Sequence, residues 1–325
     1  MIDHLPVQKI LLNNKEVPIT GNVWIPEPSP YFKDYLWYLN LARRTRDVPV
    51  DIIHNATQFY TRGKFRQKYV MTCMDTIPYT HPEYMNPLSR IYGRLLPGAA
   101  KTADRIICIS RNTERDLIKA VPKTEGKTTV IYPGISPIFK PDPSISRNFN
   151  MVLYVGSIDP RKNVEMLIQA FAELKDDYSL WIAGRYGWGN SLTVPQLAAK
   201  WGVLERTYYL GYVPASVKLQ LYNMATVLVY PSLYEGFGLP PVEAMACGCP
   251  VIAFDNSSLP EACGNAALLV KNNNFKHFVA LLMAILEEES WQRGYSKLGI
   301  QNAAKFNWSD KAKEIMKVYE EVLSL

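Results

Sequence analysis

The chain has 325 residues, of which 48% are hydrophobic and 12% aromatic. This composition excludes a largely disordered protein and fits about two globular domains. No apolar run approaches the roughly 18 residues that span a bilayer, and the N-terminus lacks a signal-peptide pattern, so we expect a cytoplasmic protein. The five cysteines lack metal-ligand spacing, which predicts buried free thiols.

The net charge of +6 is unevenly distributed. Residues 1–150 carry 21 Lys+Arg against 13 Asp+Glu, so this half is +8 and the remainder is −2. Two basic segments, 42–46 and 61–68, are candidates for contact with an anionic membrane surface or an acidic acceptor, and a plain solvated surface is the equal alternative. Nucleic acid is not expected, because aromatic residues are not interleaved with the basic ones.

The first half alternates irregularly between strands and helices. Apolar, β-branched runs predict strands at 50–54, 68–73, 105–110 and 128–132. A helix is predicted at 112–120. Residues 1–50 show no strand, glycine-rich loop and helix in succession, and Gly21 stands alone there. The proline-rich stretch 133–143 can continue neither kind of element and is predicted to be an interdomain linker.

From residue 150 onward, strands and helices alternate regularly. Strands are predicted at 151–155, 179–183, 207–210, 227–230, 251–254 and 267–270. An amphipathic pattern predicts a helix at 163–174. This alternation implies a doubly wound parallel sheet, in which ligands lie at the carboxyl ends of the strands. Apolar residues at 308, 312, 315, 319 and 322 predict a closing helix.

The most specific pattern lies between Tyr230 and Pro250. It places Glu235 and Glu243 on either side of a glycine-containing turn, and two prolines predict that a helix begins after the turn. Glycines let the backbone approach a ligand closely, and the amide groups at a helix start bind anions, so the turn suits a phosphate. On its own, a glutamate in a first helical turn is also ordinary capping chemistry.

The string E-G-F-G-L-P-P-V-E-A-M-A-C-G-C-P-V-I closely resembles the signature of the family 4 retaining glycosyltransferases, in which two glutamates separated by seven residues mark the donor site. Four other stretches match that family in order. They are Y-V-G-S-I-D-P-R-K-N-V-E from Tyr154, I-A-G-R-Y-G-W-G from Ile182, L-G-Y-V-P-A from Leu210 and S-S-L-P-E-A-C-G-N-A-A-L-L-V from Ser257. The first of them resembles the mannosyltransferase-like branch.

The resemblance covers nearly all of the chain from Asp51 onward and implies an α/β fold of the GT-B type. Two Rossmann-like domains would then face a cleft, and the N-terminal one is expected to be small or incomplete. The implied domains are an acceptor-side domain at 1–143, a nucleotide-sugar-binding domain at 144–306, and a closing helix at 307–325 that crosses back to the N-terminal domain.

The resemblance also assigns roles to residues. Arg161 and Lys162 match family cations on the donor diphosphate, where positive charge would stabilise the leaving group. Glu243 is expected to accept hydrogen bonds from the ribose, and Glu235 to lie nearer the transferred sugar. The implied catalytic residues are Glu235, Arg161, Lys162 and Asp75. The implied donor-binding residues are Gly156, Ser157, Arg161, Lys162, Gly184, Gly211, Tyr212, Val213, Glu235, Gly236, Phe237, Gly238, Leu239 and Glu243.

For some of these residues a structural alternative stays open. Gly211, Tyr212 and Val213, which the family places beside the nucleobase, fit a plain surface loop equally well. Glu261, which follows Pro260, fits a charge at a helix start.

The pattern departs from the family in the first half. Asp75 is kept, but Met74 stands where the family usually has a histidine that faces the transferred sugar. His54 matches a position near the cleft, although a lone histidine at a strand end is more often structural. In the second half, Ser157 stands where many relatives carry arginine. The missing glycine-rich unit in residues 1–50 implies either a lost or a diverged segment.

The sequence therefore favours a retaining, metal-independent hexosyltransferase that uses a nucleotide sugar, with GDP-mannose preferred, and a glycan or lipid-linked acceptor. No metal and no cofactor are expected, and the two glutamates are not expected to act as a glycosidase pair. Two alternatives stay open: a transferase that uses UDP-glucose or UDP-N-acetylglucosamine, and a catalytically weak nucleotide-sugar-binding subunit that needs a partner chain. A sugar-nucleotide epimerase is disfavoured because histidines are few. Peripheral contact with the inner face of a membrane, through the basic half, is a further hypothesis.

Overall fold

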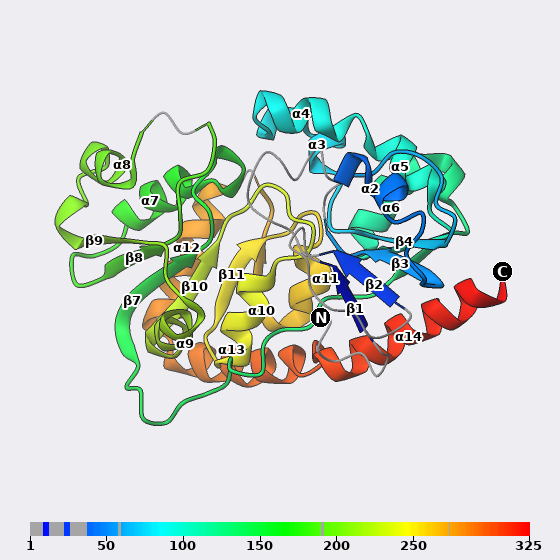
Figure 1. Cartoon of the computed structure of the whole chain (residues 1–325). Coiled ribbons are helices and arrows are strands. Elements are labelled where there is room, and N and C mark those ends of the chain that lie inside the picture. Colours follow the sequence, from blue (N-terminus) through cyan, green and yellow to red (C-terminus); the bar gives the residue numbers. More distant parts are fainter. Residues whose placement is uncertain (1–8, 13–22, 27–37, 58–59, 190–191, 273) are drawn as a thin grey trace. The chain divides into compact units, whose positions relative to one another are not determined.

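The computed structural model describes residues 9–12, 23–26, 38–57, 60–189, 192–272 and 274–325. The chain divides into two compact units, one made of Met1–Gly134 with Trp308–Leu325 and the other of Ile135–Asn307. Each unit contains a parallel β-sheet with helices packed against it (Figure 1). The predicted α/β fold class is confirmed.

The sheet of the first unit has the strand order β1-β2-β3-β4-β5-β6. Its strands are β1 (Lys9–Leu12), β2 (Val23–Pro26), β3 (Ile52–Asn55), β4 (Lys68–Cys73), β5 (Arg105–Cys108) and β6 (Thr128–Val130). Its helices are α2 (Leu41–Arg44), α3 (Ile77–Thr80), η2 (Pro82–Tyr84), α4 (Pro87–Gly93), α5 (Leu96–Thr102), α6 (Arg111–Ala120), η3 (Pro122–Thr124) and α14 (Trp308–Ser324). The four strands predicted from the sequence are present within a few residues of their expected bounds.

Strands β1 and β2 lie within residues 1–50, a stretch for which the sequence predicts no regular strand, loop and helix unit. Both are runs of four residues that pair in parallel, and β2 continues the sheet next to β3. Such short runs lack the length and the turn signals that mark a strand in sequence. Gly21 and its neighbours lie outside the described residues.

Two apolar clusters cover the two faces of this sheet, because neighbouring strand residues point to opposite sides. One face packs against α2, α5 and α6 through residues such as Leu41, Leu96 and Leu117. The other face packs against α14, and this cluster comprises Ile52, Val70, Ile107, Ile131, Ala312, Ile315, Val318, Tyr319 and Val322. The apolar stripe predicted for the closing helix is thus the face that it buries in the first unit.

The sheet of the second unit has the strand order β12-β11-β10-β7-β8-β9. Its strands are β7 (Asn148–Val155), β8 (Ser179–Ala183), β9 (Thr207–Gly211), β10 (Ala225–Tyr230), β11 (Val251–Phe254) and β12 (Leu268–Val270). Its helices are η4 (Pro160–Lys162), α7 (Val164–Ala172), α8 (Val194–Lys200), η5 (Leu204–Arg206), α9 (Ala215–Met224), α10 (Leu239–Ala246), α11 (Leu259–Cys263), η6 (Gly264–Ala266), α12 (Phe275–Glu287) and α13 (Glu289–Ala303). All six predicted strands are present.

The strand order of the second unit reverses between β7 and β10, which pair directly with each other. Chain connections run from β7 toward β9 on one side and from β10 toward β12 on the other. In open parallel sheets, ligands bind at the carboxyl ends of the strands where the order reverses. The loops after β7 and β10 are therefore the ones best placed for a ligand.

The boundary between the units falls at Gly134, whereas the sequence placed it after residue 143. Residues 135–143 contact the second unit, because the Phe139 ring meets Tyr222 edge-on at 5.7 Å and the Asn223 side chain donates a hydrogen bond to the Lys140 carbonyl. The proline-rich segment is thus irregular in backbone, as predicted, but most of it packs as part of one unit.

Two further sequence expectations concern the chain as a whole. All five cysteines are buried and free, as predicted. In the part of the chain that the structure describes, no helix combines the length and the apolar character needed to cross a membrane.

Candidate functional site

The turn between β10 and α10 carries the two signature glutamates. Gly238 caps α10 with a φ of 104°, a left-handed conformation that glycine adopts without strain. A Cβ there would also lie 2.8 Å from a methyl group of Leu259. Prolines occupy the first turn of α10, as predicted from the sequence. This turn places Glu235 and Glu243 at the carboxyl edge of the sheet, one before the helix and one inside it.

Glu235 is the centre of a buried cluster of charges. Its side chain lies 2.5 Å from Lys162 Nζ through Oε1 and 3.2 Å from Arg161 Nη1 through Oε2. Lys162 Nζ also donates to the Tyr230 hydroxyl at 2.6 Å, and only 7% of Lys162 and 8% of Glu235 is exposed. Both cations that the sequence assigned to the donor diphosphate thus contact the first signature glutamate, a coupling that the sequence did not predict.

The cluster keeps Glu235 ionised. Burial alone would raise the pKa of Glu235, but the charges of Lys162 and Arg161, with hydrogen bonds from Lys162 and Ser232, hold it below its ordinary value. Asp159 belongs to the same cluster, since its Oδ1 lies 3.9 Å from Arg161 Nε, so two cations face two carboxylates. An anion that binds beside Arg161 and Lys162 interacts with them strongly, because little water screens the interaction.

The backbone around Glu235 is fixed by three side chains. The Glu235 N–H donates to Ser257 Oγ, and Ser258 Oγ donates to the Glu235 carbonyl, both at 2.9 Å. Arg161 Nη1 donates to the Tyr234 carbonyl at 2.5 Å. Ser257 itself has a φ of 46°, which is uncommon for a residue other than glycine. Sequence reasoning missed both serines, although they begin one of the stretches that match the family.

Glu243 is held by two residues of α9 that sequence reasoning also missed. Lys218 Nζ and the Tyr222 hydroxyl both bind its Oε2, at 2.7 and 2.9 Å, and only 9% of Glu243 is exposed. Within the described residues, Oε1 accepts no hydrogen bond. The four-residue spacing that puts Lys218 and Tyr222 on one face of α9 was the available signal.

Three predicted glycines bring the ends of β7, β8 and β9 together. The Gly156 N–H donates to the Ala183 carbonyl at 3.0 Å, and the Gly184 N–H donates to the Gly211 carbonyl at 2.7 Å. A Cβ on Gly184 would lie 1.7 Å from the Gly156 carbonyl oxygen, a distance that no side chain can occupy. Glycine is therefore required where these loops meet.

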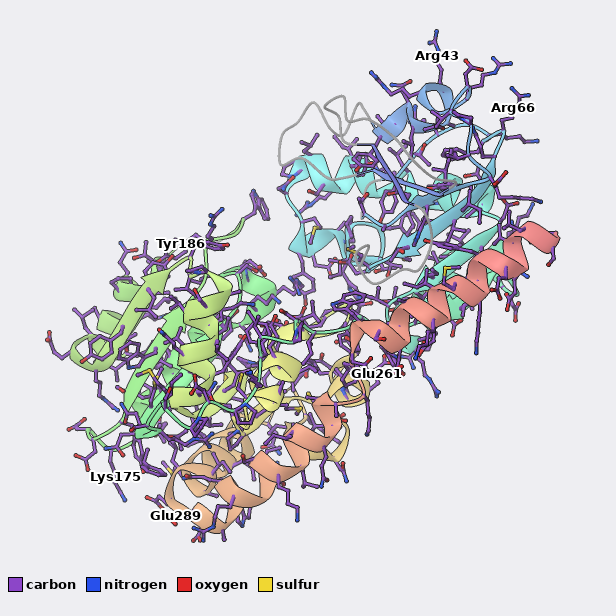
Figure 2. All side chains as sticks on the ribbon, turned by 60° about the horizontal axis from the view of Figure 1, so that its bottom comes forward. Arg43, Arg66, Lys175, Tyr186, Glu261 and Glu289 are labelled. Carbon is purple, nitrogen blue, oxygen red and sulfur yellow. The ribbon has the colours of Figure 1, made fainter. Side chains whose placement is uncertain are left out.

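The loops after β8 and β9 present aromatic side chains to solvent. Tyr212 is largely exposed, and the Arg185 guanidinium lies 4.2 Å from the centre of its ring. Figure 2 labels Tyr186, which projects from the loop after β8; its ring lies 5.0 Å from that of Tyr209. Val213 is half-buried beside Tyr212. An exposed ring with a cation on one face can stack on a planar ligand.

The other predicted donor residues lie in the same loops and differ in their exposure and contacts. Ser157 Oγ donates to Asp159 at 2.7 Å, and Leu239 is exposed at the start of α10. Gly236 and Phe237 are buried, and the Phe237 ring meets Phe306 edge-on at 5.3 Å. Glu261 lies in the first turn of α11, in agreement with the helix-start alternative.

Three candidates lie in the first unit. Asp75 Oδ1 accepts a hydrogen bond from the Ile77 N–H at the start of α3, and Met74 beside it is half-buried. His54 is fully buried, with Nδ1 2.6 Å from the Tyr319 hydroxyl and Nε2 2.8 Å from Thr72 Oγ1. Both ring nitrogens are engaged inside the unit, so His54 ties β3 to β4 and α14 in a structural role.

This role predicts a dependence of stability on pH. Burial lowers the pKa of His54 from 6.5 to about 3. Below the unfolded pKa, the unfolded chain takes up a proton that the folded chain does not, so the free energy of unfolding falls as the pH drops from 6.5 toward 3. Between pH 7 and 5 we expect a loss of about 2 kcal/mol from this group.

Urea unfolding of the wild type and of His54→Gln at pH 7 and pH 5 would measure this loss. The variant should lose less stability than the wild type over this interval, even if it is less stable at pH 7. Equal losses in the two proteins would contradict the assignment.

Two family models match successive parts of the chain. The family model described as Glycosyl transferases group 1 matches residues 136–320, and the model described as Glycosyltransferase Family 4 matches residues 6–138. O-antigen chain mannosyltransferase B of Escherichia coli is 29% identical over 292 residues, which are 83% of this chain and 74% of that protein. Serotype-specific mannosyltransferase WbdA of Escherichia coli is 27% identical over 274 residues, which are 75% of this chain but 32% of that protein.

Among solved structures, HepE of Anabaena in complex with UDP and glucose superposes with a TM-score of 0.76 at 20% sequence identity, covering 97% of this chain and 100% of that one. This likeness establishes the fold, which is of the GT-B type predicted from the sequence. The model for group 1 spans more than half of the chain and contains Arg161, Lys162, Glu235 and Glu243. The chain therefore belongs to the glycosyltransferase family described as Glycosyl transferases group 1.

Proposed function

We propose that this chain is a retaining hexosyltransferase that moves mannose from GDP-mannose to a glycan or lipid-linked acceptor. The observation that carries the proposal is the buried cluster of Glu235, Arg161 and Lys162. It joins η4 to the turn that precedes α10, the helix that carries Glu243. The preference for mannose is supported by the names of the two relatives from Escherichia coli.

The donor would be held at both ends of its nucleoside diphosphate. Glu243 has one carboxylate oxygen fixed by Lys218 and Tyr222, which leaves Oε1 to accept a hydrogen bond from a ribose hydroxyl. Arg161 and Lys162 would bind the diphosphate through charge-assisted hydrogen bonds. The close-packed backbone at Gly156 and Gly184 lets the donor approach the loops after β7 and β8.

The geometry of Glu235 supports transfer without a covalent glycosyl-enzyme. Each of its carboxylate oxygens contacts a cation, and its lowered pKa reflects those contacts. A carboxylate held in this way is a weak nucleophile, because attack would separate it from both cations. The acceptor hydroxyl would instead attack the face that the nucleotide leaves, and the departing phosphate would take its proton.

Metal independence is part of the proposal. Arg161 and Lys162 supply two positive charges where a diphosphate would gain negative charge as the glycosidic bond breaks. Transfer measured in the presence of EDTA should therefore match transfer in its absence. A loss that magnesium restores would show that a metal ion is required.

A panel of nucleotides and donors tests the proposal directly. Calorimetry with GDP, UDP and ADP should give the tightest binding for GDP, and nucleotide release with an acceptor extract should be fastest with GDP-mannose. Faster release with UDP-glucose or UDP-N-acetylglucosamine would replace the donor but keep the reaction. No release with any of the three donors would contradict catalysis by this chain.

Glu243→Gln is expected to weaken nucleotide binding by roughly 10- to 100-fold, because hydrogen bonds to a charged acceptor are worth more than neutral ones. Tyr222→Phe should weaken it only a few-fold, since Lys218 still holds the carboxylate. Glu165→Gln makes the same chemical change on the exposed face of α7, where the side chain pairs with Lys200, and serves as the control. An unchanged dissociation constant in Glu243→Gln would remove the ribose assignment.

A second candidate is a nucleotide-sugar-binding subunit that transfers sugar only with a partner chain. Met74 favours it, because a thioether cannot make the hydrogen bonds of the histidine expected at that position. Purified alone, such a subunit would bind nucleotide normally but release none from a donor. Transfer by the isolated chain would exclude this candidate.

A further inference from the structure

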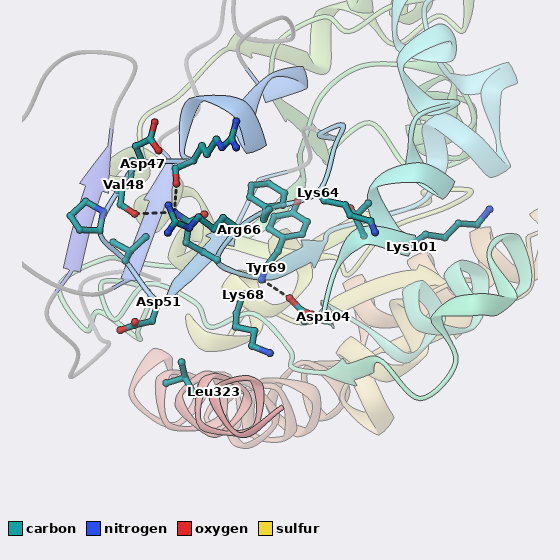
Figure 3. Close-up of a pocket in the computed structure, with 16 residues that line it drawn as sticks. Asp47, Val48, Asp51, Lys64, Arg66, Lys68, Tyr69, Lys101, Asp104 and Leu323 are labelled. Atoms are coloured by element: carbon teal, nitrogen blue, oxygen red, sulfur yellow. Dashed lines mark hydrogen bonds between the residues drawn. The ribbon is translucent and has the colours of Figure 1, made fainter.

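A cavity of about 1260 Å³ lies at the amino-terminal edge of the sheet in the first unit. Asp51, Lys68 and Asp104 of its lining stand where β3, β4 and β5 begin. Ligand sites of open parallel sheets lie at the opposite, carboxyl-terminal edge. None of the residues assigned above to donor binding lines this cavity (Figure 3).

The lining of the cavity is rich in cations. It contains the basic residues Arg46, Lys64, Arg66, Lys68 and Lys101. Among the residues that the structure describes, none of these five side chains forms an ion pair. Three carboxylates also line the cavity, and one of them, Asp104, already accepts a hydrogen bond from the Tyr69 N–H at 2.8 Å. The cavity therefore has more cationic than anionic side chains in its lining, and its carboxylates do not neutralise the five cations.

The structure brings together two basic segments that are separate in sequence. Gln67 Nε2 donates to the backbone carbonyls of Thr45 at 2.7 Å and of Val48 at 2.9 Å. This side chain fixes the segment after α2 against the segment that leads into β4. Figure 2 shows Arg43 and Arg66, one from each segment, projecting from the same end of the unit. The fold thus brings the basic side chains of the two segments together, and the hydrogen bonds of Gln67 fix the two segments against each other.

We propose that this cavity is a second anion site, which binds phosphate groups. Guanidinium and ammonium groups that lack carboxylate partners are the side chains that recognise phosphate. Asp47 and Asp51 share the cavity and would accept hydrogen bonds from hydroxyl groups next to the phosphate, as in a phosphorylated polyol. The phosphate could belong to an anionic lipid headgroup or to a free phosphorylated molecule, and the two sources are separated by experiment. The site does not depend on the proposed transfer reaction.

Two probes distinguish the sources with the full chain. Tripolyphosphate is titrated by calorimetry, and vesicles of phosphatidylcholine with or without phosphatidylglycerol are tested by co-sedimentation. Binding to the phosphatidylglycerol vesicles identifies a lipid headgroup. Binding to tripolyphosphate without vesicle binding identifies a soluble phosphorylated ligand. A wild-type chain that binds neither probe overturns the proposal.

The variant Lys64→Glu/Arg66→Glu isolates the cavity from the donor site, where Arg161 and Lys162 stay unchanged. Both side chains are exposed, so the fold should tolerate the change. Binding should fall roughly 30-fold or more, because each cation near an anionic surface contributes on the order of 1 kcal/mol. Lys119→Glu/Lys317→Glu makes the same change in net charge at exposed positions of α6 and α14 outside the cavity. Equal loss in both variants would show a general charge effect and overturn the site.

A gain of binding provides a test that misfolding cannot imitate. Asp47→Asn/Asp51→Asn removes the two carboxylates that form no hydrogen bond within the described part of the chain. A phosphate site should then bind tripolyphosphate several-fold more tightly, because like-charge repulsion is removed. Unchanged or weaker binding of tripolyphosphate by this variant would count against a phosphate in the cavity.

Discussion

Lys162→Met should lower the rate of sugar transfer roughly 100- to 1000-fold, the cost of removing one preorganised charge from a developing anion. The wild-type ammonium is buried, lies 2.5 Å from Glu235 and is oriented by the Tyr230 hydroxyl. A methionine fills much of the same volume but carries no charge. The loss should appear mainly in kcat, because the negative charge of the leaving diphosphate grows in the transition state.

Stability must be separated from activity in this experiment. The single variant leaves Glu235 with Arg161 as its only cation, so the free energy of unfolding should fall by about 2 kcal/mol. The double variant Lys162→Met/Glu235→Gln also neutralises the Glu235 carboxylate and leaves Arg161 with Asp159. It should regain part of that stability without regaining activity. Lys200→Met, at an exposed ion pair with Glu165, is the matched control and should keep full activity. Parallel recovery of stability and activity in the double variant would contradict a direct role for Lys162.

The second unit was predictable from sequence to a large extent. Its strands are short apolar runs bounded by glycine and proline, so their positions follow from pattern alone. The turn around Gly236 and Gly238 was predictable for the same reason, since glycine, proline and a helical pattern follow one another there. The placement of Glu235 and Glu243 at the carboxyl edge of the sheet then follows from the parallel topology.

The partners of the two glutamates were not predictable in this way. Ser257 and Ser258 follow β11 and contact Glu235, which follows the neighbouring strand β10. Lys218 and Tyr222 contact Glu243 from a helix earlier in the chain. Such contacts depend on packing between elements rather than on local pattern. The ion pairs that join Arg161 and Lys162 to Glu235 have the same origin, since more than seventy residues separate their partners in sequence.

The first unit shows a different limit. Strands β1 and β2 have only four residues each, too few for a period to be recognised. The sequence shows that segments 42–46 and 61–68 are basic. It does not show that both contribute to one cavity, because their distance in space depends on the fold. The structural role of His54 depends on its hydrogen bond with Tyr319. Tyr319 lies on the closing helix, far away in sequence, so this contact could not be predicted from local pattern.

Gly184→Ala is expected to destabilise the second unit by about 3 kcal/mol or more, since a Cβ there meets a backbone atom that cannot move alone. The added carbon would lie 1.7 Å from the Gly156 carbonyl oxygen. Relief of this clash requires the loops after β7 and β8 to separate. That movement would stretch the hydrogen bonds from Gly156 to Ala183 and from Gly184 to Gly211.

Chemical denaturation with guanidinium would measure this loss, with Gly202→Ala as the matched control. Gly202 also has a positive φ, 72°, but a Cβ there meets no atom within 4 Å. The control should therefore lose only about 1 kcal/mol, the cost of a left-handed conformation for alanine. The two losses separate backbone conformation from close approach. If both variants lose the same stability, the contact between the loops does not hold this edge of the sheet together, and the glycine at 184 is required only for its φ.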